Sequence, residues 1–222
     1  YMNKNIRKWL VAKVKNTFNI FGWVKLALVN YDKKPPIYEK MNNKGLKVHI
    51  GSGEINIQGW INIDARDFAH VHIIDKEINL AEFTDNSIQE IYLCHILEHV
   101  SFAELEKILK LIYLKLQVGG LVRLSVPDFD KILSIYHAED NNIDRVKHIL
   151  MGGQDYEFNF HKSVYTKTFL SKTLMKNQFI DVSEWDTLSD FGVSLGDWSN
   201  GQVKTKNGKM LVSLNLKAIK GV

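Results

Sequence analysis

The sequence predicts an α/β fold with a mostly parallel sheet, preceded by a separate basic arm. Three observations lead to this prediction. Short apolar segments typical of buried strands alternate with segments whose apolar residues recur at helical spacing. The first strand runs directly into a glycine-rich turn, and the second ends in an acid. The last strand has no helix before it, which suits an antiparallel insertion at the end of the sheet.

The composition indicates one globular domain with a sizeable core. The chain has 222 residues, of which 45% are hydrophobic and only three are proline. The single cysteine, Cys94, cannot form an internal disulfide, so we expect a reducing, cytoplasmic compartment. The longest apolar run, residues 20–29, contains Lys25 and is too short to span a bilayer.

The basic charge is concentrated in the N-terminal arm, residues 1–44. Of the net charge of +4, residues 1–31 carry +6, so the remainder carries −2. Apolar residues four apart form one stripe of a helix there: Ile6, Leu10, Val14 and Phe18. A basic amphipathic helix of this kind would lie on an anionic membrane face, or dock on the body of the chain or on a partner protein. Pro35 and Pro36 break regular structure, and the main domain is expected over residues 45–222.

A glycine-rich turn follows the first predicted strand, residues 46–50. In the Gly-Ser-Gly of residues 51–53, the two glycines permit a tight turn and a close approach of the backbone to a ligand. The second strand, residues 60–63, ends at Asp64. An acid in that place binds ribose hydroxyl groups in parallel α/β sheets.

The spacing of these residues favours a mononucleotide-like ligand over a dinucleotide. A dinucleotide fingerprint needs a third glycine three residues after the second, and an acid about 20 residues further on. Here the third glycine is Gly59, and Asp64 follows Gly53 by eleven residues, which leaves no room for a full crossover helix. The alternative is a glycine hairpin between two ordinary strands, because short glycine motifs often occur by chance.

The remaining elements are predicted from apolar periodicity and turn residues. Further strands are expected at residues 71–74, 88–93, 121–126, 179–185 and 210–219. A capping box at Ser101 and Glu104 opens a helix that is expected to stop at Gly119 and Gly120. More helices are expected at residues 128–137, 142–151 and 166–176. Residues 152–165, rich in aromatic residues and histidine, and residues 187–208 have the composition of loops.

Four segments carry a further signal through their order along the chain. They are HIGSG at residues 49–53, GWINID at 59–64, DNSIQEIYLCHILEH at 85–99 and VGGLVRLSVPD at 118–128. Together they resemble class I S-adenosylmethionine-dependent methyltransferases, most closely a branch associated with cell-surface polysaccharide clusters. The resemblance spans about residues 46–185. It implies a three-layer Rossmann-like fold with a seven-stranded sheet, and S-adenosylmethionine as the cofactor.

The resemblance also implies roles for individual residues. Cofactor-binding roles fall on Gly51, Ser52 and Gly53 beneath the methionine and ribose, Asp64 at the ribose hydroxyl groups, Asn79 and Leu80 at the adenine, and His95 near the sulfonium. The sequence departs from the family at His49 and Asn79, where an acid is common, and at Ser52, where Cys is frequent.

Methyl transfer to a hydroxyl group needs a positioned acceptor and removal of its proton. The candidate catalytic residues near strand ends are His161, His95 and Asp128, with His161 favoured as the base. The candidate acceptor-binding residues are Tyr156, His161, Tyr165 and Asp128. For the two histidines and Tyr165 the alternative is a packing role. Phe191 and Trp198, in the loop of residues 187–208, are expected to cover the acceptor.

The segment HILEH at residues 95–99 also matches a zinc-hydrolase signature. The capping box places the helix after this segment, and no third zinc ligand is evident from the sequence. We therefore predict no metal, and we interpret Glu98 and His99 as mainly structural.

Two further alternatives concern the class of function. The chain could be a methyltransferase-like scaffold without activity, because fold does not imply function. It could also act on RNA, but a charge of −2 outside the arm disfavours a nucleic-acid partner. The fifth strand ends in Ser-Val-Pro-Asp rather than the Asn-Pro-Pro-aromatic motif of many enzymes that methylate amino groups. We therefore expect an oxygen acceptor on a small molecule or glycan, and the assignment to surface-glycan biosynthesis comes from the resemblance.

Overall fold

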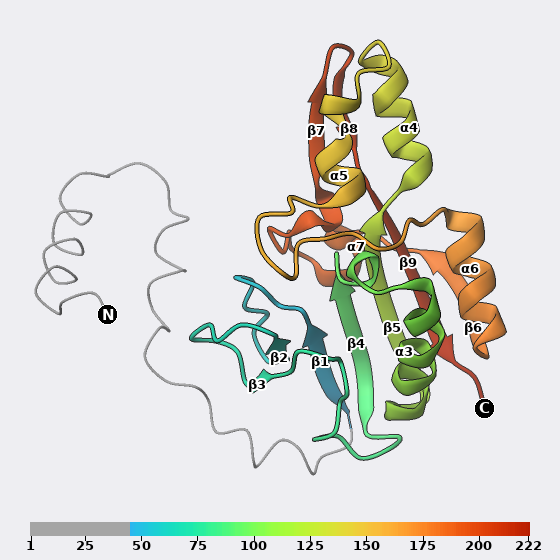
Figure 1. The fold of residues 1–222 in the computed structure, drawn as a ribbon. Coiled ribbons are helices and arrows are strands. Elements are labelled where there is room, and N and C mark those ends of the chain that lie inside the picture. The colour runs from blue at the N-terminus through green and yellow to red at the C-terminus, as the bar shows by residue number, and fades with distance from the viewer. Residues whose placement is uncertain (1–44) are drawn as a thin grey trace, which may run out of the picture. The chain divides into compact units, whose positions relative to one another are not determined.

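The structure is a computed structural model, and it describes residues 45–222. A seven-stranded sheet forms its centre (Figure 1). Across the sheet the strands are β3 (Ile73–Ile74), β2 (Ile61–Asp64), β1 (Leu46–Ile50), β4 (Ile88–Cys94), β5 (Leu116–Pro127), β9 (Ser213–Lys220) and β6 (Phe179–Glu184). The first five pair in parallel, and β9 runs antiparallel to both of its neighbours. The predicted fold class, with its antiparallel last strand, is confirmed.

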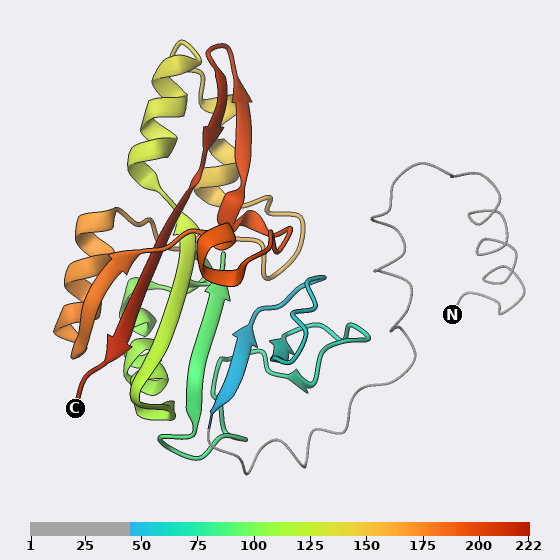
Figure 2. The ribbon, with the colours of Figure 1, turned by 180° about the vertical axis from the view of Figure 1, so that it is seen from behind.

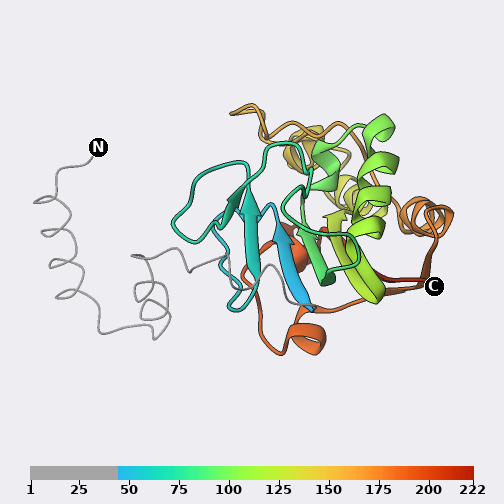
Figure 3. The same cartoon turned by 90° about the horizontal axis from the view of Figure 1, so that it is seen from below.

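The two faces of the sheet are covered differently, as Figures 2 and 3 show. Helices α3 (Phe102–Lys115) and α6 (Lys167–Lys176) pack on one face, and the short helix α7 (Thr187–Phe191) lies on the other. Successive strand residues point to opposite faces. Leu93 of β4 accordingly joins the cluster that includes α3 and α6 residues, whereas the preceding Tyr92 contacts Phe191 of α7.

A smaller group of elements extends beyond the carboxyl ends of the strands (Figure 1). It comprises α4 (Phe129–Ala138), α5 (Lys147–Met151) and a hairpin of β7 (Gln202–Thr205) and β8 (Gly208–Leu211). Three 3-10 turns complete the described chain: η1 (Leu97–His99), η2 (Ile143–Arg145) and η3 (Trp198–Asn200). Within residues 45–222, none of the helices has both the length and the hydropathy needed to cross a bilayer.

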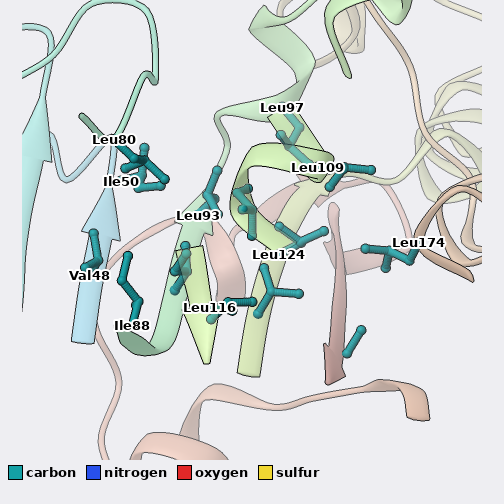
Figure 4. Close-up of a cluster of buried hydrophobic side chains, with 14 of the residues drawn as sticks. Val48, Ile50, Leu80, Ile88, Leu93, Leu97, Leu109, Leu116, Leu124 and Leu174 are labelled. Carbon is teal, nitrogen blue, oxygen red and sulfur yellow. The ribbon is translucent and has the colours of Figure 1, made fainter. Parts of the chain in front are cut away.

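The main core lies between the sheet and helices α3 and α6, as Figure 4 shows. Leu109 of α3 is fully buried, and so are Leu124 of β5 and Leu174 of α6. Burying a leucine side chain contributes about 2 kcal/mol, so this layer supplies much of the stability that holds the strand ends in place.

The helix α3 begins as predicted but ends earlier. The capping box is present, with the Ser101 backbone N–H donating to Glu104 Oε2 over 3.2 Å. The helix ends at Lys115, and β5 starts at the next residue, so the expected stop at Gly119 and Gly120 is wrong. Those glycines form a bulge within β5 instead. A Cβ on Gly120 would lie 2.8 Å from the carbonyl oxygen of Gln117, so the bulge needs a glycine there.

The predicted last strand, residues 210–219, is divided in two at Val212. Its backbone N–H donates to the Gly201 carbonyl oxygen over 3.1 Å, and its carbonyl oxygen accepts from Asp128 N–H over 2.8 Å. These bonds draw Val212 out of both sheets, so β8 pairs with β7 in a hairpin that the sequence analysis did not predict. The predicted basic helix in residues 1–44 lies outside the described residues.

Candidate active site

A large cavity opens at the carboxyl ends of β1, β2 and β4, where the strand order reverses direction around β1. This reversal is where open α/β sheets bind their ligands. The cavity has a volume of about 1310 Å³. Since sites for one small molecule usually measure about 300–1,000 Å³, it has room for a cofactor and an acceptor together.

The glycine-rich turn forms one wall of this cavity. Gly51 and Gly53 have φ values of 68° and 52°, which favour glycine. A Cβ on Gly51 would lie 1.9 Å from Cδ1 of Ile96, so there is also no room for a side chain at this position. Ser52 N–H donates to the Ile63 carbonyl oxygen over 3.0 Å, which ties the turn to β2.

Asp64 lies at the end of β2, beside the same turn, and its side chain is buried. Its Oδ2 accepts a 2.7 Å hydrogen bond from Gly53 N–H, and its Oδ1 accepts a 2.9 Å bond from Arg66 N–H. A carboxylate oxygen can accept more than one hydrogen bond. The two backbone bonds therefore hold the carboxylate in place and leave acceptor capacity on both oxygens for a pair of hydroxyl groups.

The two residues expected to contact the adenine lie in different environments. Asn79 lines the cavity, and its Oδ1 accepts a 2.9 Å hydrogen bond from Ala81 N–H. Leu80 is fully buried in the main core and is not one of the described residues that line the cavity. The chain makes a turn here, with positive φ values of 55° at Ile78 and 48° at Leu80.

His95 follows β4 directly and lines the cavity, but both of its ring nitrogens are already engaged. Nε2 lies 2.8 Å from Ser213 Oγ, and Nδ1 lies 3.1 Å from Glu98 Oε1. Ser213 donates its own proton to the Trp198 carbonyl oxygen, so its oxygen accepts from Nε2–H. These contacts fit a role for His95 in positioning Glu98. They do not fit the removal of a proton from an acceptor.

His161 also lines the cavity, on the loop after α5, and is partly buried. Burial lowers the pKa of His161 below its ordinary value, although the Glu98 carboxylate acts in the opposite direction. A neutral imidazole at neutral pH is the form that accepts a proton or binds a metal. His161 lies beside His99, with the two ring centroids 4.9 Å apart, a contact that was not predicted from the sequence.

Glu98 is fully buried behind these histidines, in η1. Burial by itself raises the pKa of this carboxyl group. The hydrogen bond and charge of His95, together with His99 and His161, outweigh that effect, so the pKa of Glu98 lies below its ordinary value. The sequence signal for this group was HILEH at residues 95–99, which lacked a third ligand until the fold brought His161 to it.

The structure does not bring Asp128 and Tyr165 to the cavity wall, as far as the described residues define it. Asp128 caps the N-terminus of α4, with Oδ1 accepting from Asp130 N–H over 3.1 Å. Tyr165 is fully buried, and its hydroxyl group contacts backbone and Ser163 rather than the cavity.

Three further expected site residues are also placed by the structure. Tyr156 lines the cavity, with the Arg66 guanidinium 5.3 Å from its ring centroid. Trp198 lines the cavity and is largely exposed, as expected of a residue that covers a ligand. Phe191 instead packs against Trp60 and Tyr92 on the α7 face of the sheet.

Solved structures, but no curated protein sequences, resemble this chain. No protein-family model and no curated protein sequence matches the chain. A SAM-dependent methyltransferase from Methanosarcina mazei superposes with a TM-score of 0.50 and 14% identity, over 86% of this chain and 99% of that one. Another from Archaeoglobus fulgidus gives a TM-score of 0.48 and 16% identity, over 82% and 89% of the two chains. Phosphoethanolamine N-methyltransferase 2 from Haemonchus contortus, solved with S-adenosyl-L-methionine, gives 0.44 and 13%, over 93% and 55%.

The strand order and the likeness to the Methanosarcina mazei structure show that this chain has the class I methyltransferase fold. At these identities the likeness concerns the fold alone.

Proposed function

We propose that the chain is an S-adenosylmethionine-dependent methyltransferase that transfers a methyl group to a hydroxyl oxygen of a small molecule or glycan. The observation that carries this proposal is the joint position of the glycine-rich turn and Asp64. The hydrogen bond from Gly53 N–H to Asp64 Oδ2 holds the two parts of a nucleoside site together at the ends of β1 and β2. A cofactor with a ribose diol and an adjacent flexible chain suits that arrangement.

The residues present fit this cofactor. Asp64 keeps acceptor capacity for the ribose hydroxyl groups. Ser52 Oγ is buried beside the turn and has no hydrogen-bond partner among the described residues, so it is available to contact a polar ligand. Asn79 supplies an amide at the place expected for the adenine. When bound, the cofactor would supply an activated methyl group, and the chain would hold the acceptor in line with it.

The acceptor side of the cavity is proposed to be the wall formed by His161, Tyr156 and Trp198. Of the three candidate bases, His161 suits proton removal best, because both ring nitrogens of His95 are engaged and Asp128 caps α4. The choice of a glycan acceptor in surface-polysaccharide synthesis rests on the family resemblance. The contact of residues 1–31 with a membrane or a partner protein stays a prediction.

Calorimetric titration with S-adenosylhomocysteine tests the cofactor assignment. We expect micromolar binding by the wild type and a loss of about 10- to 150-fold for Asp64→Ala, the equivalent of about 1.5–3 kcal/mol for hydrogen bonds to a charged group. Glu82→Ala removes an exposed carboxylate that does not line the cavity and should bind like the wild type. Absence of binding by folded wild-type protein would contradict the proposal and favour a scaffold role.

A further inference from the structure

Three potential metal ligands converge on the acceptor side of the cavity. They are Glu98 and His99 of η1 and His161 of the loop after α5, whose ligand atoms all lie within 4.8 Å of one another. Ligands of one zinc ion lie about 2.0–2.2 Å from the metal, so side-chain movements of roughly 1 Å would close the set around an ion. The three residues also line the cavity, so an ion there would reach the acceptor.

Glu98 is the strongest sign that a cation belongs here. Its side chain is 1% exposed, and Oε2 has no hydrogen-bond partner among residues 45–222. Burying a carboxylate oxygen without a partner is costly unless a cation or hydrogen-bond donor compensates. The His95 ring contacts Oε1, with Nδ1 at 3.1 Å, so Oε2 is the atom that we expect a metal ion to bind.

The two histidines are oriented by backbone carbonyl groups. His99 Nδ1 lies 3.2 Å from the Phe160 carbonyl oxygen, and His161 hydrogen-bonds to the backbone of Leu150. Metal-binding histidines usually donate one ring N–H to such a partner, which leaves the other nitrogen for the metal. His95 orients Glu98 in the same way, through the contact of its Nδ1 with Glu98 Oε1. Ser213 in turn holds the His95 ring through Nε2.

The backbone fixes the distance between the two segments. Lys162 N–H and Ser163 N–H both donate to the Glu98 carbonyl oxygen, over 2.7 and 3.2 Å. His161 N–H donates to the Met151 carbonyl oxygen over 3.0 Å. Gly152 leaves room for the histidine, because a Cβ there would lie 3.1 Å from His161 Cδ2. The ligand set is therefore built into the fold rather than assembled from free surface side chains.

We propose that Glu98, His99 and His161 bind one divalent transition-metal ion, with open coordination positions facing the cavity. Two imidazoles and one carboxylate are a donor set of catalytic zinc sites, and imidazole also suits other first-row transition metals. The binding site stands on its own geometry, whereas its role rests on the proposed function. The ion would bind the acceptor hydroxyl group and lower its pKa.

The chemical step then balances without a further reactant. The acceptor O–H proton passes to water, and the oxygen bound to the metal attacks the methyl carbon. An O–C bond forms while the C–S bond breaks, and its electron pair returns to sulfur to give S-adenosylhomocysteine. In this arrangement His161 is a metal ligand, and the metal replaces it as the means of activating the hydroxyl group.

The test measures metal binding and cofactor binding separately on the full chain. After chelator treatment and removal of the chelator, the wild type is titrated with Zn²⁺, Mn²⁺ and Co²⁺. We expect one ion per chain and visible absorption bands from bound Co²⁺. His161→Gln and Glu98→Gln should each weaken binding at least about tenfold. His137→Gln, which changes an exposed histidine outside the cavity, should bind like the wild type.

The outcomes separate this inference from the proposed function. If S-adenosylhomocysteine binds but no metal binds above the level of non-specific sites, the metal site is wrong, and His161 stays the proposed base. If metal binds equally to the wild type and His161→Gln, the ligand assignment is wrong. If metal binds as expected but S-adenosylhomocysteine does not, the metal site stands and the methyltransferase proposal falls. Should Glu98→Gln fail to fold, His161→Gln, at a partly exposed position, carries the test.

Discussion

The hydroxyl group of Tyr165 donates a 2.9 Å hydrogen bond to the backbone carbonyl oxygen of Leu97. This contact joins the segment after β4 to the loop that carries His161. Ser163 reinforces it, because its Oγ lies 2.9 Å from the Val100 carbonyl oxygen. Tyr165 thus supports the wall of the candidate active site from behind, whereas the sequence analysis expected it to contact the acceptor.

Tyr165→Phe should therefore weaken the folded state without removing an acceptor contact. Loss of one buried hydrogen bond is expected to lower the free energy of unfolding by about 1 kcal/mol, measured by urea denaturation. Tyr113→Phe is the matched control, since its hydroxyl group makes only a 3.4 Å bond to the Gly221 carbonyl oxygen. Equal, negligible losses in both variants would contradict the assignment of Tyr165 as a support.

Gly51→Ala should destabilise the protein for two separable reasons. A positive φ costs a non-glycine residue about 1–2 kcal/mol, and the new Cβ would also collide with Ile96. Gly59→Ala has a positive φ but no atom within 4 Å of the new Cβ, so it should show the backbone cost alone. In a double-mutant cycle, Ile96→Ala should recover part of the extra loss in Gly51→Ala. Purely additive free energies of unfolding would show that the collision is unimportant.

Asp128→Ala tests whether this residue is a helix cap or an acceptor-site residue. Loss of the cap on α4 should lower the free energy of unfolding by about 1 kcal/mol. Thr166→Ala removes the equivalent cap on α6, where Thr166 Oγ1 accepts from Phe169 N–H, and should cost a similar amount. Both variants should bind S-adenosylhomocysteine like the wild type. A fall in methyl transfer by folded Asp128→Ala, but not by Thr166→Ala, would restore the catalytic interpretation.

The burial of His49 should make the stability of the protein depend on pH. Burial lowers the pKa of His49 to about 4, against an ordinary value of 6.5. The unfolded chain therefore takes up a proton at a higher pH than the folded chain, so stability is present above pH 6.5 and is lost as the pH falls toward 4. The full difference corresponds to about 3 kcal/mol.

The difference between wild type and His49→Gln isolates this contribution. Urea denaturation at pH values from 7.5 to about 4.5 should show a shallower decline for the variant. His137→Gln, at an exposed position, should decline like the wild type. Parallel curves for the wild type and His49→Gln would contradict a buried neutral histidine at this position.

A buried ion-pair network on the α7 face of the sheet predicts a large effect at Arg123. Its Nε lies 2.7 Å from Glu90 Oε1, and its Nη1 contacts Asp190 of α7. Arg123→Met removes one cationic partner from each carboxylate, while Lys47 still pairs with Glu90 and Lys217 with Asp190, and it should cost about 3 kcal/mol in unfolding free energy. Lys167→Met breaks the pair with Glu184, in which both side chains are 59% exposed, and should cost less than about 1 kcal/mol. Similar losses in the two variants would show that the network contributes little.

Local patterns explain why much of the fold could be predicted. Short apolar segments identified β1 and β4, and the capping box located the start of α3, because both signals depend on near neighbours in the chain. The stop of α3 was misplaced because glycine marks a bulge as readily as a helix end. Gly119 and Gly120 lie in a bulge that exists only because β5 pairs with β4.

The same difference between local patterns and long-range contacts explains which site residues could be predicted. The sequence by itself determined the glycine-rich turn and Asp64, since strand ends and backbone freedom are local properties that place these residues at one edge of the sheet. Only the tertiary structure decided which polar side chains reach the cavity. Backbone bonds between the Glu98 carbonyl oxygen and residues 162–163 bring His161 to Glu98, while Tyr165 turns inward. Such contacts join segments far apart in the chain, so no local spacing could reveal them.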